Sequence, residues 1–360
     1  MGPALHEGRP AQWAKRPGVA RRFLRSRAWL GAFSIAAASA AYAQAGAQSA
    51  AQVPPQEESR DARSWLMRIH EAASRRNYQG TLVVTTAGSV SSSRVAHFCD
   101  GKQQYERVEA LDGQARSMVR RNEEVHTLWP KAKVAVVEQR DTRASFPALL
   151  SGGGRGVLEW YELKVQGPDR IAGYDAEVVL LKARDAMRYS QRLWAERQTG
   201  LLLRSDTLQA DGRLLESSAF SELAINVKPQ PDLLMQPLKR LDGYRVLRPA
   251  VLPTTLEAEG WSLGAVPAGF KEVQCAKRSL DPTGGNSAPV VLQAIYSDGL
   301  THVSLFIEPF QAQRHQAELN AAIGATHTLM VRLGDHWITV VGDVPAETLK
   351  RFVAALDRKH

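Results

Sequence analysis

The residues that could perform chemistry lie along this chain without the spacing that a catalytic or metal site requires. His70-Glu71 begins the His-Glu-x-x-His pattern of zinc proteases, but Ser74 stands where the second histidine should be. The Gly-x-Ser-x-Gly and Ser-x-x-Lys patterns of activated serine nucleophiles do not occur in the sequence. Gly152-Gly153-Gly154 lacks the Lys-Ser or Lys-Thr pair of a phosphate-binding loop, which favours a hinge or a mobile flap. We therefore expect a binding protein without a metal ion or a cofactor, not an enzyme.

Two further sets of reactive side chains carry weak signals. His315, His327 and His336 are near neighbours in the sequence and could titrate together below neutral pH. Strand alternation assigns them to no common site, so separate surface or core positions are favoured. Cys99 and Cys275 could form a disulfide in an oxidising compartment or stay as two buried thiols, and two thiols alone cannot build a structural zinc site. Two separate thiols are favoured, because cysteine is among the most buried residue types.

The distribution of charge argues against a nucleic-acid partner. The formal net charge is +9, but residues 1–43 hold seven basic residues and only one acidic residue. The remaining residues are close to balance on either side of Val227, so neither part is a basic module. We therefore expect a partner of another class.

Residues 1–43 have the order of an export signal. Four arginines between positions 21 and 27 precede the apolar run Ala28–Ala41, and Ala41-Tyr42-Ala43 offers a small-x-small cleavage site. Ordinary secretory export is favoured over the twin-arginine route, because Arg21-Arg22 is not followed by the usual spacer residue. The mature protein would begin at Gln44, which cannot accept a lipid as a cysteine would. No later stretch reaches the roughly 18 consecutive apolar residues that cross a bilayer, so we expect a periplasmic protein.

The next part of the chain reads as a helix followed by a large sheet. Residues 44–60 are rich in Ala, Gln, Ser and Pro, which predicts a disordered leader. Apolar residues then recur at spacings of three and four over 61–76, as in an amphipathic helix. Short β-rich runs follow, and we expect a curved antiparallel sheet of roughly eleven strands within a domain spanning residues 61–227. The runs lie at 80–86, 92–99, 103–109, 116–121, 125–129, 134–139, 158–165, 176–183, 190–196, 201–208 and 214–223.

A change of composition marks a second domain. Residues 228–260 contain five prolines and scattered leucines, which predicts a linker. A smaller domain should occupy residues 261–360. In it, strands at 290–296 and 302–308 are joined by Ser297-Asp298-Gly299, and the Asp-Gly step is typical of a hairpin turn. Strands at 326–333 and 337–341 follow, and then a helix whose apolar stripe includes Leu349, Phe352 and Leu356.

The sheet of the first domain has more apolar surface than one helix of sixteen residues can cover. This surface is either an ordinary core or the lining of a cavity for an acyl chain, because a curved sheet around a helix leaves a concave apolar space. Basic residues at its mouth could meet anionic headgroups or could form a solvated edge. The candidate lipid-binding residues are Leu82, Val84, Trp129, Val136, Trp160, Trp194, Arg120 and Lys131.

The hairpin of the second domain is a candidate docking edge for a protein partner. A large apolar hairpin beside a short turn suits the addition of a peptide, although a purely structural turn is nearly as well supported. The candidate partner-binding residues are Tyr296, Leu300, Phe306 and Phe310.

Several long motifs give the chain a resemblance to a known family. They lie in order at 171–204, 260–270, 295–309 and 340–345. On these stretches, from Ala62 to the terminus, the chain resembles the MucB/RseB family of periplasmic regulators of envelope-stress sigma factors. It departs from the family at Ser190-Gln191, where Gly-Tyr is frequent, at Asp343, where Glu is commoner, and in its extended basic leader. These departures affect local strand packing and leave the expected role unchanged.

The resemblance implies a fold and a role. It implies an α+β, mainly β chain with an N-terminal half-open antiparallel β-barrel over helices, similar to lipoprotein carriers, and a smaller C-terminal α/β domain. It also implies binding to the periplasmic domain of an inner-membrane anti-sigma factor (RseA or MucA), protection of that factor from site-one proteolysis, and release by lipid or lipopolysaccharide. A periplasmic lipid or lipoprotein carrier without an anti-sigma client is the alternative. The sequence leaves the oligomeric state open.

Overall fold

A computed structural model describes residues 55–139, 146, 148, 150, 156–279 and 290–359. These residues form a mainly β protein with few helices. The predicted export signal, residues 44–54 of the predicted leader and the three glycines at 152–154 lie outside the described residues. No helix in the described part of the chain has the length and apolar character needed to cross a membrane.

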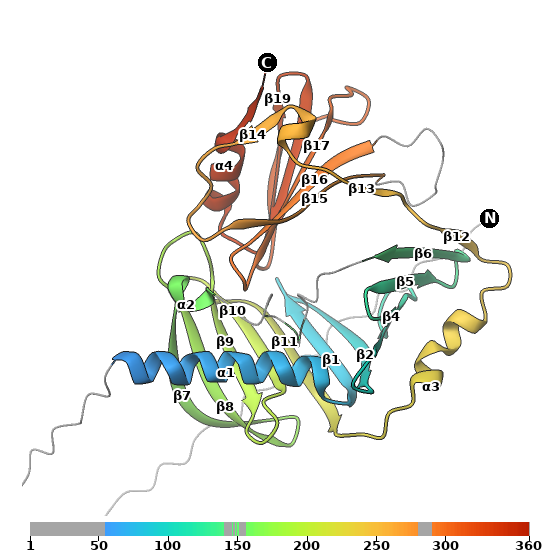
Figure 1. The fold of residues 1–360 in the computed structure, drawn as a ribbon, viewed down its shortest axis with the longest axis vertical. Coiled ribbons are helices and arrows are strands. Elements are labelled where there is room, and N and C mark those ends of the chain that lie inside the picture. The colour runs from blue at the N-terminus through green and yellow to red at the C-terminus, as the bar shows by residue number, and fades with distance from the viewer. Residues whose placement is uncertain are drawn as a thin grey trace, which may run out of the picture. The chain divides into compact units, whose positions relative to one another are not determined.

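The first helix, α1 (Pro55–Arg75), begins six residues earlier than the sequence pattern predicted. The prediction of a disordered leader is therefore wrong for residues 55–60. The apolar stripe of α1 is buried at Leu66, Ile69, Ala72 and Ala73, because residues three and four positions apart share one face of a helix. Figure 1 shows α1 lying across the strands of the first sheet, and it contacts β2 (Ser89–Cys99) and β10 (Leu202–Leu208) of that sheet.

The first sheet has twelve strands in the order β12-β6-β5-β4-β3-β2-β1-β11-β10-β9-β8-β7. All neighbours are antiparallel except β12, which is parallel to β6. The described strands form an open sheet with β12 at one edge and β7 at the other. Each of the eleven predicted strands is present, and ten of them agree with the prediction to within about three residues at their ends. The prediction for 158–165 is wrong at both ends, since residues 158–160 belong to a short helix and the strand continues to Ile171. The bounds of the eleven strands are β1 (Tyr78–Thr86), β2 (Ser89–Cys99), β3 (Gln104–Ala110), β4 (Ser117–Arg121), β5 (Glu124–Trp129), β6 (Val134–Gln139), β7 (Tyr161–Ile171), β8 (Tyr174–Ala183), β9 (Ser190–Glu196), β10 (Leu202–Leu208) and β11 (Leu214–Ile225).

The two faces of this sheet carry different apolar clusters. On the α1 side, Leu66 and Ile69 pack with residues such as Leu193 and Leu202 and with the short helix α2 (Val157–Trp160). Neighbouring residues on the same strands face the other way, since side chains alternate along a strand. That second cluster contains Ala176, Val178, Trp194 and Leu203.

The segment predicted to be a linker is built into both sheets. It contains α3 (Pro231–Met235), the 3-10 helices η2 (Gln236–Lys239) and η3 (Glu257–Glu259), and the strands β12 (Arg245–Leu247) and β13 (Val251–Pro253). β12 pairs with β6 of the first sheet, and β13 pairs with β15 of the second. Backbone hydrogen bonds therefore hold this connection to both sheets, which its proline-rich composition did not predict.

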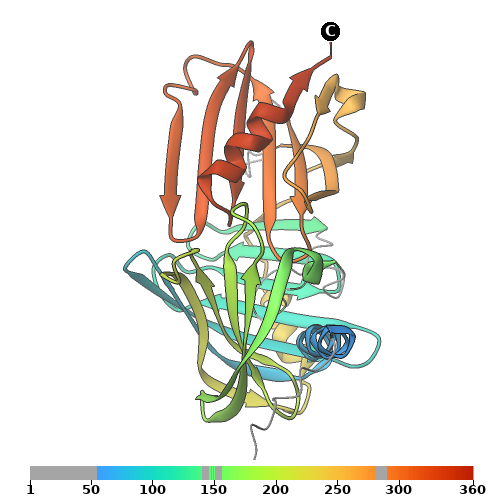
Figure 2. The ribbon, with the colours of Figure 1, turned by 90° about the vertical axis from the view of Figure 1, so that its left-hand side faces the viewer.

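The second sheet has seven strands in the order β13-β15-β16-β17-β20-β19-β18. Its other strands are β15 (Lys271–Ser279), β16 (Val290–Ser297), β17 (His302–Pro309), β18 (Leu319–Ile323), β19 (Thr326–Leu333) and β20 (His336–Gly342). Helix α4 (Ala346–Ala355) covers one face (Figure 2), and β14 (Trp261–Leu263) pairs with β21 (Leu356–Arg358) in a separate two-stranded sheet. The core between α4 and the sheet includes Tyr296, Val303, Leu305 and Ile338 of the strands and Phe352 of α4. β15, β18 and the β14–β21 pair were not predicted from the sequence.

Candidate functional site

The turn between β16 and β17 is fixed by its own side chains. Gly299 has φ +97°, a conformation that glycine adopts without steric cost. Asp298 Oδ1 accepts hydrogen bonds from the N–H groups of Leu300 and Thr301, both at 2.9 Å. The Ser297 hydroxyl donates to the Thr301 carbonyl at 2.9 Å. The sequence therefore specifies a rigid turn, as the Asp-Gly step predicted.

The second carboxylate oxygen of Asp298 binds the first domain. Asp298 Oδ2 accepts hydrogen bonds from the Tyr161 hydroxyl at 3.0 Å and from Arg188 Nη1 at 2.8 Å. The side chains of Asp298 and Arg188 are both fully shielded from solvent. An ion pair removed from water in this way is stable only when its remaining polar groups are also satisfied.

Arg188 meets that condition through further contacts from both domains. Its Nε donates to Asp185 Oδ1 at 3.0 Å and its Nη2 donates to the Ala268 carbonyl at 2.5 Å. The guanidinium carbon lies 4.9 Å from the centre of the Trp160 ring and 5.2 Å from that of Phe270, within the range of cation–π attraction. Trp160 comes from α2 and Phe270 from the second domain, so one arginine joins three segments that are distant in the sequence.

Apolar contacts extend this junction. Leu300, at the tip of the hairpin, is buried in the α1-side cluster of the first domain together with Leu66 and Ile69. The Thr348 hydroxyl at the start of α4 donates to the Met187 carbonyl at 2.7 Å. We call the set formed by Tyr161, Arg188, Asp298 and Leu300 the interdomain junction.

Burial also controls the chemistry of Tyr161. Desolvation, and then the negative charge of Asp298, raise the pKa of its hydroxyl well above the ordinary value. The tyrosine therefore stays neutral and donates its proton to the Asp298 carboxylate.

The four predicted partner-binding residues do not form one open surface. Tyr296 is 5% exposed and its ring packs on Phe352, whereas Leu300 is covered by the first domain. Phe306 is half-buried on the sheet face away from α4. Phe310 is also half-buried, with the Arg332 guanidinium 4.0 Å from its ring centre. Tyr296 and Leu300 can therefore reach a partner only if their present contacts open.

Strand register places most of the predicted lipid-binding residues on one face. Leu82 packs at the edge of another cluster on the α1 side, which contains Ala72 and Val95. The pairing of β1 through β6 puts Val84, Arg120, Trp129 and Val136 on the same face. Trp160 packs at the other end of this face. Trp194 lies on the opposite face, where its Nε1 donates to Asp169 Oδ2 at 2.8 Å. The structure therefore does not bring Trp194 together with the others.

The two predicted headgroup-binding residues have different surroundings. Arg120 pairs with Glu106 at 3.8 Å, and both side chains are mostly buried. Burial raises the pKa of the Glu106 carboxyl although the charge of Arg120 opposes the rise. Lys131 is exposed between β5 and β6. Only Lys131 is therefore placed to meet a ligand from solvent in this conformation.

The histidines and cysteines noted in the sequence lie apart. His315 stacks on Trp337, His327 lies beside Tyr189, and His336 contacts Trp261. Cys99 and Cys275 are both free thiols. Among the residues that the structure describes, no three His, Cys, Asp or Glu side chains are arranged to hold a metal ion.

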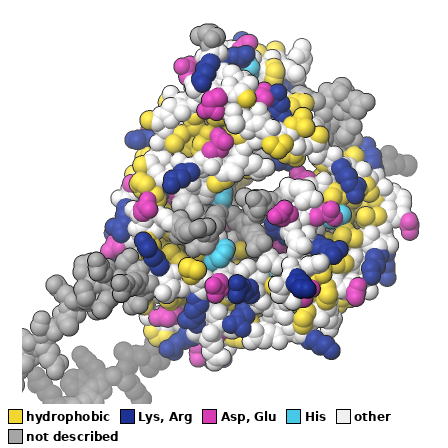
Figure 3. All heavy atoms as spheres, in the orientation of Figure 1, with side chains coloured by type: hydrophobic (Ala, Val, Ile, Leu, Met, Phe, Trp, Pro, Cys, Tyr) yellow, Lys and Arg dark blue, Asp and Glu magenta, His cyan; other side chains and the backbone are white. Residues whose placement is uncertain are grey.

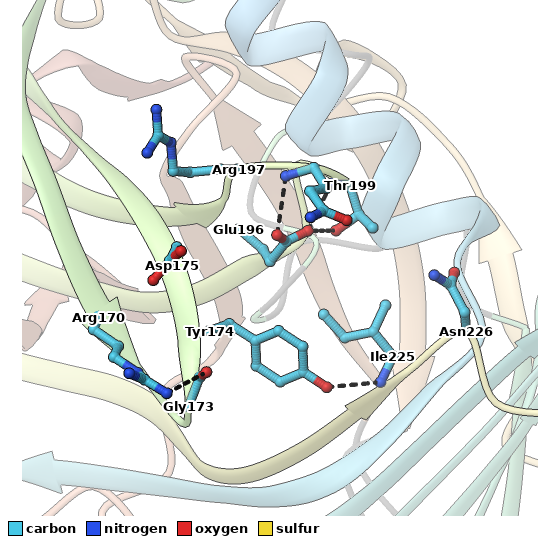
Figure 4. Close-up of a pocket in the computed structure, with 10 residues that line it drawn as sticks. Arg170, Gly173, Tyr174, Asp175, Glu196, Arg197, Thr199, Ile225 and Asn226 are labelled. Carbon is cyan, nitrogen blue, oxygen red and sulfur yellow. Dashed lines mark hydrogen bonds between the residues drawn. The ribbon is translucent and has the colours of Figure 1, made fainter.

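Among the cavities lined by described residues, two have mainly polar linings. One of about 590 Å³ lies at the β7–β8 and β9–β10 turns (Figure 4), where Glu196 accepts hydrogen bonds from Thr199 and Gln198. A second of about 200 Å³ lies between the sheets, with Glu216 from β11 on one side and His302 and Asp343 on the other. Neither has the apolar lining that was predicted for an acyl chain.

Comparison with known proteins decides the family. The family model of the MucB/RseB N-terminal domain matches residues 61–238, and that of the MucB/RseB C-terminal domain matches residues 255–357. The chain belongs to the MucB/RseB family. The gap between the two models, residues 239–254, falls in the proline-rich connection.

Relatives within the MucB/RseB family are regulatory proteins. The chain is 30% identical to the sigma factor AlgU regulatory protein MucB of Pseudomonas aeruginosa, over 84% of this chain and 92% of that protein. It is 26% identical to the sigma-E factor regulatory protein RseB of Haemophilus influenzae, over 81% and 90% of the two chains. A crystal structure of MucB in complex with MucA(peri) matches with a TM-score of 0.63 and 28% identity, covering 83% of this chain and 100% of that chain.

Sequence reasoning missed the residues of this MucB/RseB chain that join its domains. Arg188, Tyr161 and Asp185 received no role, and Asp298 was interpreted only as a turn residue. The available signals were an arginine beside apolar strand residues and an acid at a hairpin tip. Neither signal identifies a partner 110 positions away in the sequence. On the face shown in Figure 3, Lys and Arg side chains are interspersed with Asp and Glu side chains.

Proposed function

We propose that this chain is a periplasmic regulator that binds the periplasmic domain of an anti-sigma factor of the RseA/MucA kind. Bound in this way, it would protect the anti-sigma factor from site-one proteolysis and restrain the envelope-stress sigma factor. The observation that carries the proposal is the match to both domains of the family, which includes a MucB solved in complex with MucA(peri).

A second part of the proposal concerns regulation by lipid. The first domain would act as a half-open antiparallel β-barrel, with an acyl chain lying on the α1 side of the sheet. The shared face of Leu82, Val84, Trp129, Val136 and Trp160 supports this position. Trp194 is left out, because it lies on the other face.

The interdomain junction supplies a route between the two ligands. Leu300 of the second domain lies in the same cluster as Leu66 and Trp160 of the first. A lipid that separates the sheet from α1 would disturb this cluster, and a partner that needs the junction closed would oppose the lipid. Each ligand would then lower the affinity of the other through one conformational equilibrium.

The main test is a binding experiment. The protein without residues 1–43 is titrated into a fluorescently labelled periplasmic domain of the anti-sigma factor from the same organism, and anisotropy reports binding. We expect saturable binding and slower cleavage of the anti-sigma domain by the site-one protease. A protein that brings down only lipid or lipoprotein from a periplasmic extract, without an anti-sigma factor, would establish the carrier alternative instead.

Two substitutions test the predicted partner surface. Leu300→Asp places a charge in an apolar cluster and should open the interdomain junction, and Phe310→Ala removes a half-buried ring, so both should weaken anti-sigma binding. Leu300→Asp should also lower stability, so affinity is measured only where circular dichroism and urea unfolding show that each variant is still folded. Val165→Asp, at a residue 60% exposed on β7, is the matched control. Unchanged affinity in both variants would remove this hairpin from the interface.

The proposed location has its own test. Amino-terminal sequencing of the protein from a periplasmic fraction should give Gln44 or a near neighbour, because cleavage is expected after Ala43. Recovery of an intact Met1 terminus from the cytoplasm would defeat the assignment.

A further inference from the structure

Contacts between the two domains are spread across the width of the second sheet. Near one edge, Arg278 Nη2 of β15 donates to Glu138 Oε1 of β6 at 2.5 Å. Further along, the β16–β17 turn carries Asp298 of the interdomain junction. At the other edge, the β18–β19 turn brings Gly324 against Thr86 of β1. These contacts follow the strand order β15-β16-β17-β20-β19-β18, so they lie in a row from one edge of the sheet to the other.

The edge at β15 is also tied covalently to the first domain. β12 pairs with β6 and β13 pairs with β15, so the chain joins the same two strands that Arg278 and Glu138 link. Only residues 248–250 separate β12 from β13. The four peptide units from Leu247 to Val251 span at most about 14 Å when fully extended. We call β12, residues 248–250, β13 and the Arg278–Glu138 pair the clasp.

Backbone hydrogen bonds hold the clasp to both domains. The Arg245 N–H donates to the Lys133 carbonyl at 2.8 Å, and the Thr254 N–H donates to the Cys275 carbonyl at 3.1 Å. Lys133 Nζ also lies 4.9 Å from the centre of the Tyr244 ring. Separation of the domains at this edge therefore requires the loss of strand pairing as well as of an ion pair.

The opposite edge, which we call the distal edge, is held by weaker contacts. Gly324 touches Thr86 without a hydrogen bond between the two side chains, because glycine has none to offer. The Tyr189 hydroxyl lies 3.4 Å from His327 Nδ1, beyond the usual length of a strong hydrogen bond. No strand of one domain pairs with a strand of the other here, within the part of the chain that the structure describes.

Two carboxyl groups oppose contact at the distal edge. Glu216 of β11 and Asp343, which follows β20, line the same cavity of about 200 Å³ from opposite domains. Burial raises the pKa of the Glu216 carboxyl, and the charge of Asp343 adds to the rise against a hydrogen bond from Thr86. The closed arrangement therefore brings together two groups that are both more stable as anions in water.

Strand spacing determines how far each contact moves if the domains rotate about the clasp. Neighbouring strands lie about 4.8 Å apart, so the five steps from β15 to β18 give a lever of roughly 24 Å. A rotation of about 20° would carry Gly324 roughly 8 Å from Thr86. The β16–β17 turn lies one to two steps from β15, so Asp298 would move by roughly 2–3 Å. That movement is enough to break its hydrogen bond to Arg188.

We propose that the two domains rotate apart about the clasp and separate at the distal edge. The inference goes beyond the proposed function and depends on neither an anti-sigma partner nor a lipid. Rotation in this direction brings Glu216 and Asp343 into water and releases the Arg188–Asp298 pair, while the strand pairs of the clasp persist. The linker predicted over residues 228–260 then bends only at residues 248–250.

A wedge at the distal edge tests the direction of opening. A Cβ atom on Gly324 would lie 2.3 Å from Thr86 Cγ2, so Gly324→Val should force this edge apart. Gly334→Val is the matched control, because Gly334 has the same φ of +61° and nothing within 4 Å of an added Cβ. Thr86→Trp wedges the edge from the first domain without straining a turn. Thr85→Trp, at an exposed residue on the other face of β1, is its control.

Two pairs of spin labels on the mature chain measure the movement by double electron–electron resonance. Cys99 and Cys275 are replaced by alanine, so that only the introduced cysteines carry labels. All four label sites are exposed: Leu214→Cys with Leu319→Cys spans the distal edge, and Val246→Cys with Leu252→Cys spans the clasp.

The two label pairs should respond differently. We expect each wedge to lengthen the distance across the distal edge by about 5–10 Å and the distance across the clasp by less than about 2 Å. Neither control should change either distance. A clasp distance that grows as much as the distal one, or a distal distance unchanged in both folded wedge variants, overturns the proposal.

Hydrogen exchange shows whether the clasp stays paired during opening. The N–H groups of Arg245 and Thr254 should exchange as slowly in Thr86→Trp as in the wild-type protein, because both are bonded within the clasp. Faster exchange at Arg245 in Thr86→Trp but not in Thr85→Trp would mean that β12 leaves β6, and the clasp would not be the pivot.

Discussion

At the scale of single residues, the ion pair between Arg188 and Asp298 should dominate the stability of the interdomain junction. Replacing Asp298 with Asn keeps the side-chain shape and an oxygen for the Leu300 and Thr301 N–H groups, but it removes the charge opposite Arg188. Removing one partner of a buried ion pair commonly lowers the free energy of unfolding by about 3–5 kcal/mol. The loss should be smaller here, because Arg188 keeps its hydrogen bond to the Asp185 carboxylate. We expect a loss of about 2–4 kcal/mol in urea unfolding followed by tryptophan fluorescence.

A double-mutant cycle supplies the control for this prediction. Arg188→Met alone leaves Asp298 buried without its cation, whereas Arg188→Met combined with Asp298→Asn leaves no unpaired charge between them. The double variant should therefore be more stable than the sum of the single effects predicts. Additive losses would mean that the two residues stabilise the protein independently.

Cys275 illustrates burial that suppresses reactivity. Desolvation, and then the charge of Glu272, raise the pKa of its thiol to about 11. At pH 8 roughly one molecule in a thousand would carry the reactive thiolate. We expect iodoacetamide to modify the half-buried Cys99 first and Cys275 only after urea is added, as measured by mass spectrometry. Equal modification of both thiols in the native protein would contradict the burial of Cys275.

The same shift fixes the direction of a pH effect. The folded-state pKa lies above the ordinary value for a thiol, so the unfolded chain releases its proton first as pH rises. The contribution of Cys275 to stability is therefore complete below the ordinary thiol pKa and is lost as pH rises towards 11.

At the scale of elements, the β16–β17 hairpin belongs to two cores. Its strands pack beneath α4 through Tyr296 and Val303, while its tip places Leu300 in the cluster of the first domain. Leu300→Ala should cost about 2–4 kcal/mol, because a buried methyl-rich side chain leaves a cavity. Leu252→Ala, at a residue 59% exposed on β13, is the matched control and should cost well under 1 kcal/mol. Similar losses in both variants, measured by urea unfolding, would place the tip outside the first core.

At the scale of the whole molecule, lipid and anti-sigma factor should compete through the junction. We expect acyl-bearing anionic lipid to reduce anti-sigma affinity by about 5–150-fold, the range of a coupling free energy of roughly 1–3 kcal/mol. Labelled anti-sigma peptide is titrated at fixed lipid concentrations below micelle formation. Leu82→Asp, on the α1 side, should abolish the lipid effect, whereas Val165→Asp should retain it. Equal affinities with and without lipid would mean that this protein protects the anti-sigma factor without sensing lipid, and that another protein receives the lipid signal.

The sequence by itself determined the local structure. Alternation of apolar and polar residues located eleven strands of the first sheet, and the Asp298-Gly299 step located the hairpin turn, because strand period and turn conformation depend on neighbouring residues. The long motifs also identified the family. The start of α1 was placed too late because residues 55–60 lack an apolar stripe, and β18 was missed because Leu-Asn-Ala-Ala-Ile does not alternate between apolar and polar residues.

The tertiary structure alone decided which distant residues meet. Register placed Trp129 and Val136 on the α1 side with Leu82 and put Trp194 on the other face, since a shift of one residue reverses every side chain of a strand. The packing of the two domains brought Arg188 to Asp298 and Leu300 to Leu66. The hairpin that the sequence predicted to bind a partner therefore also forms a contact between the domains. Such contacts depend on how two sheets pack, and no local pattern of residue types encodes that packing.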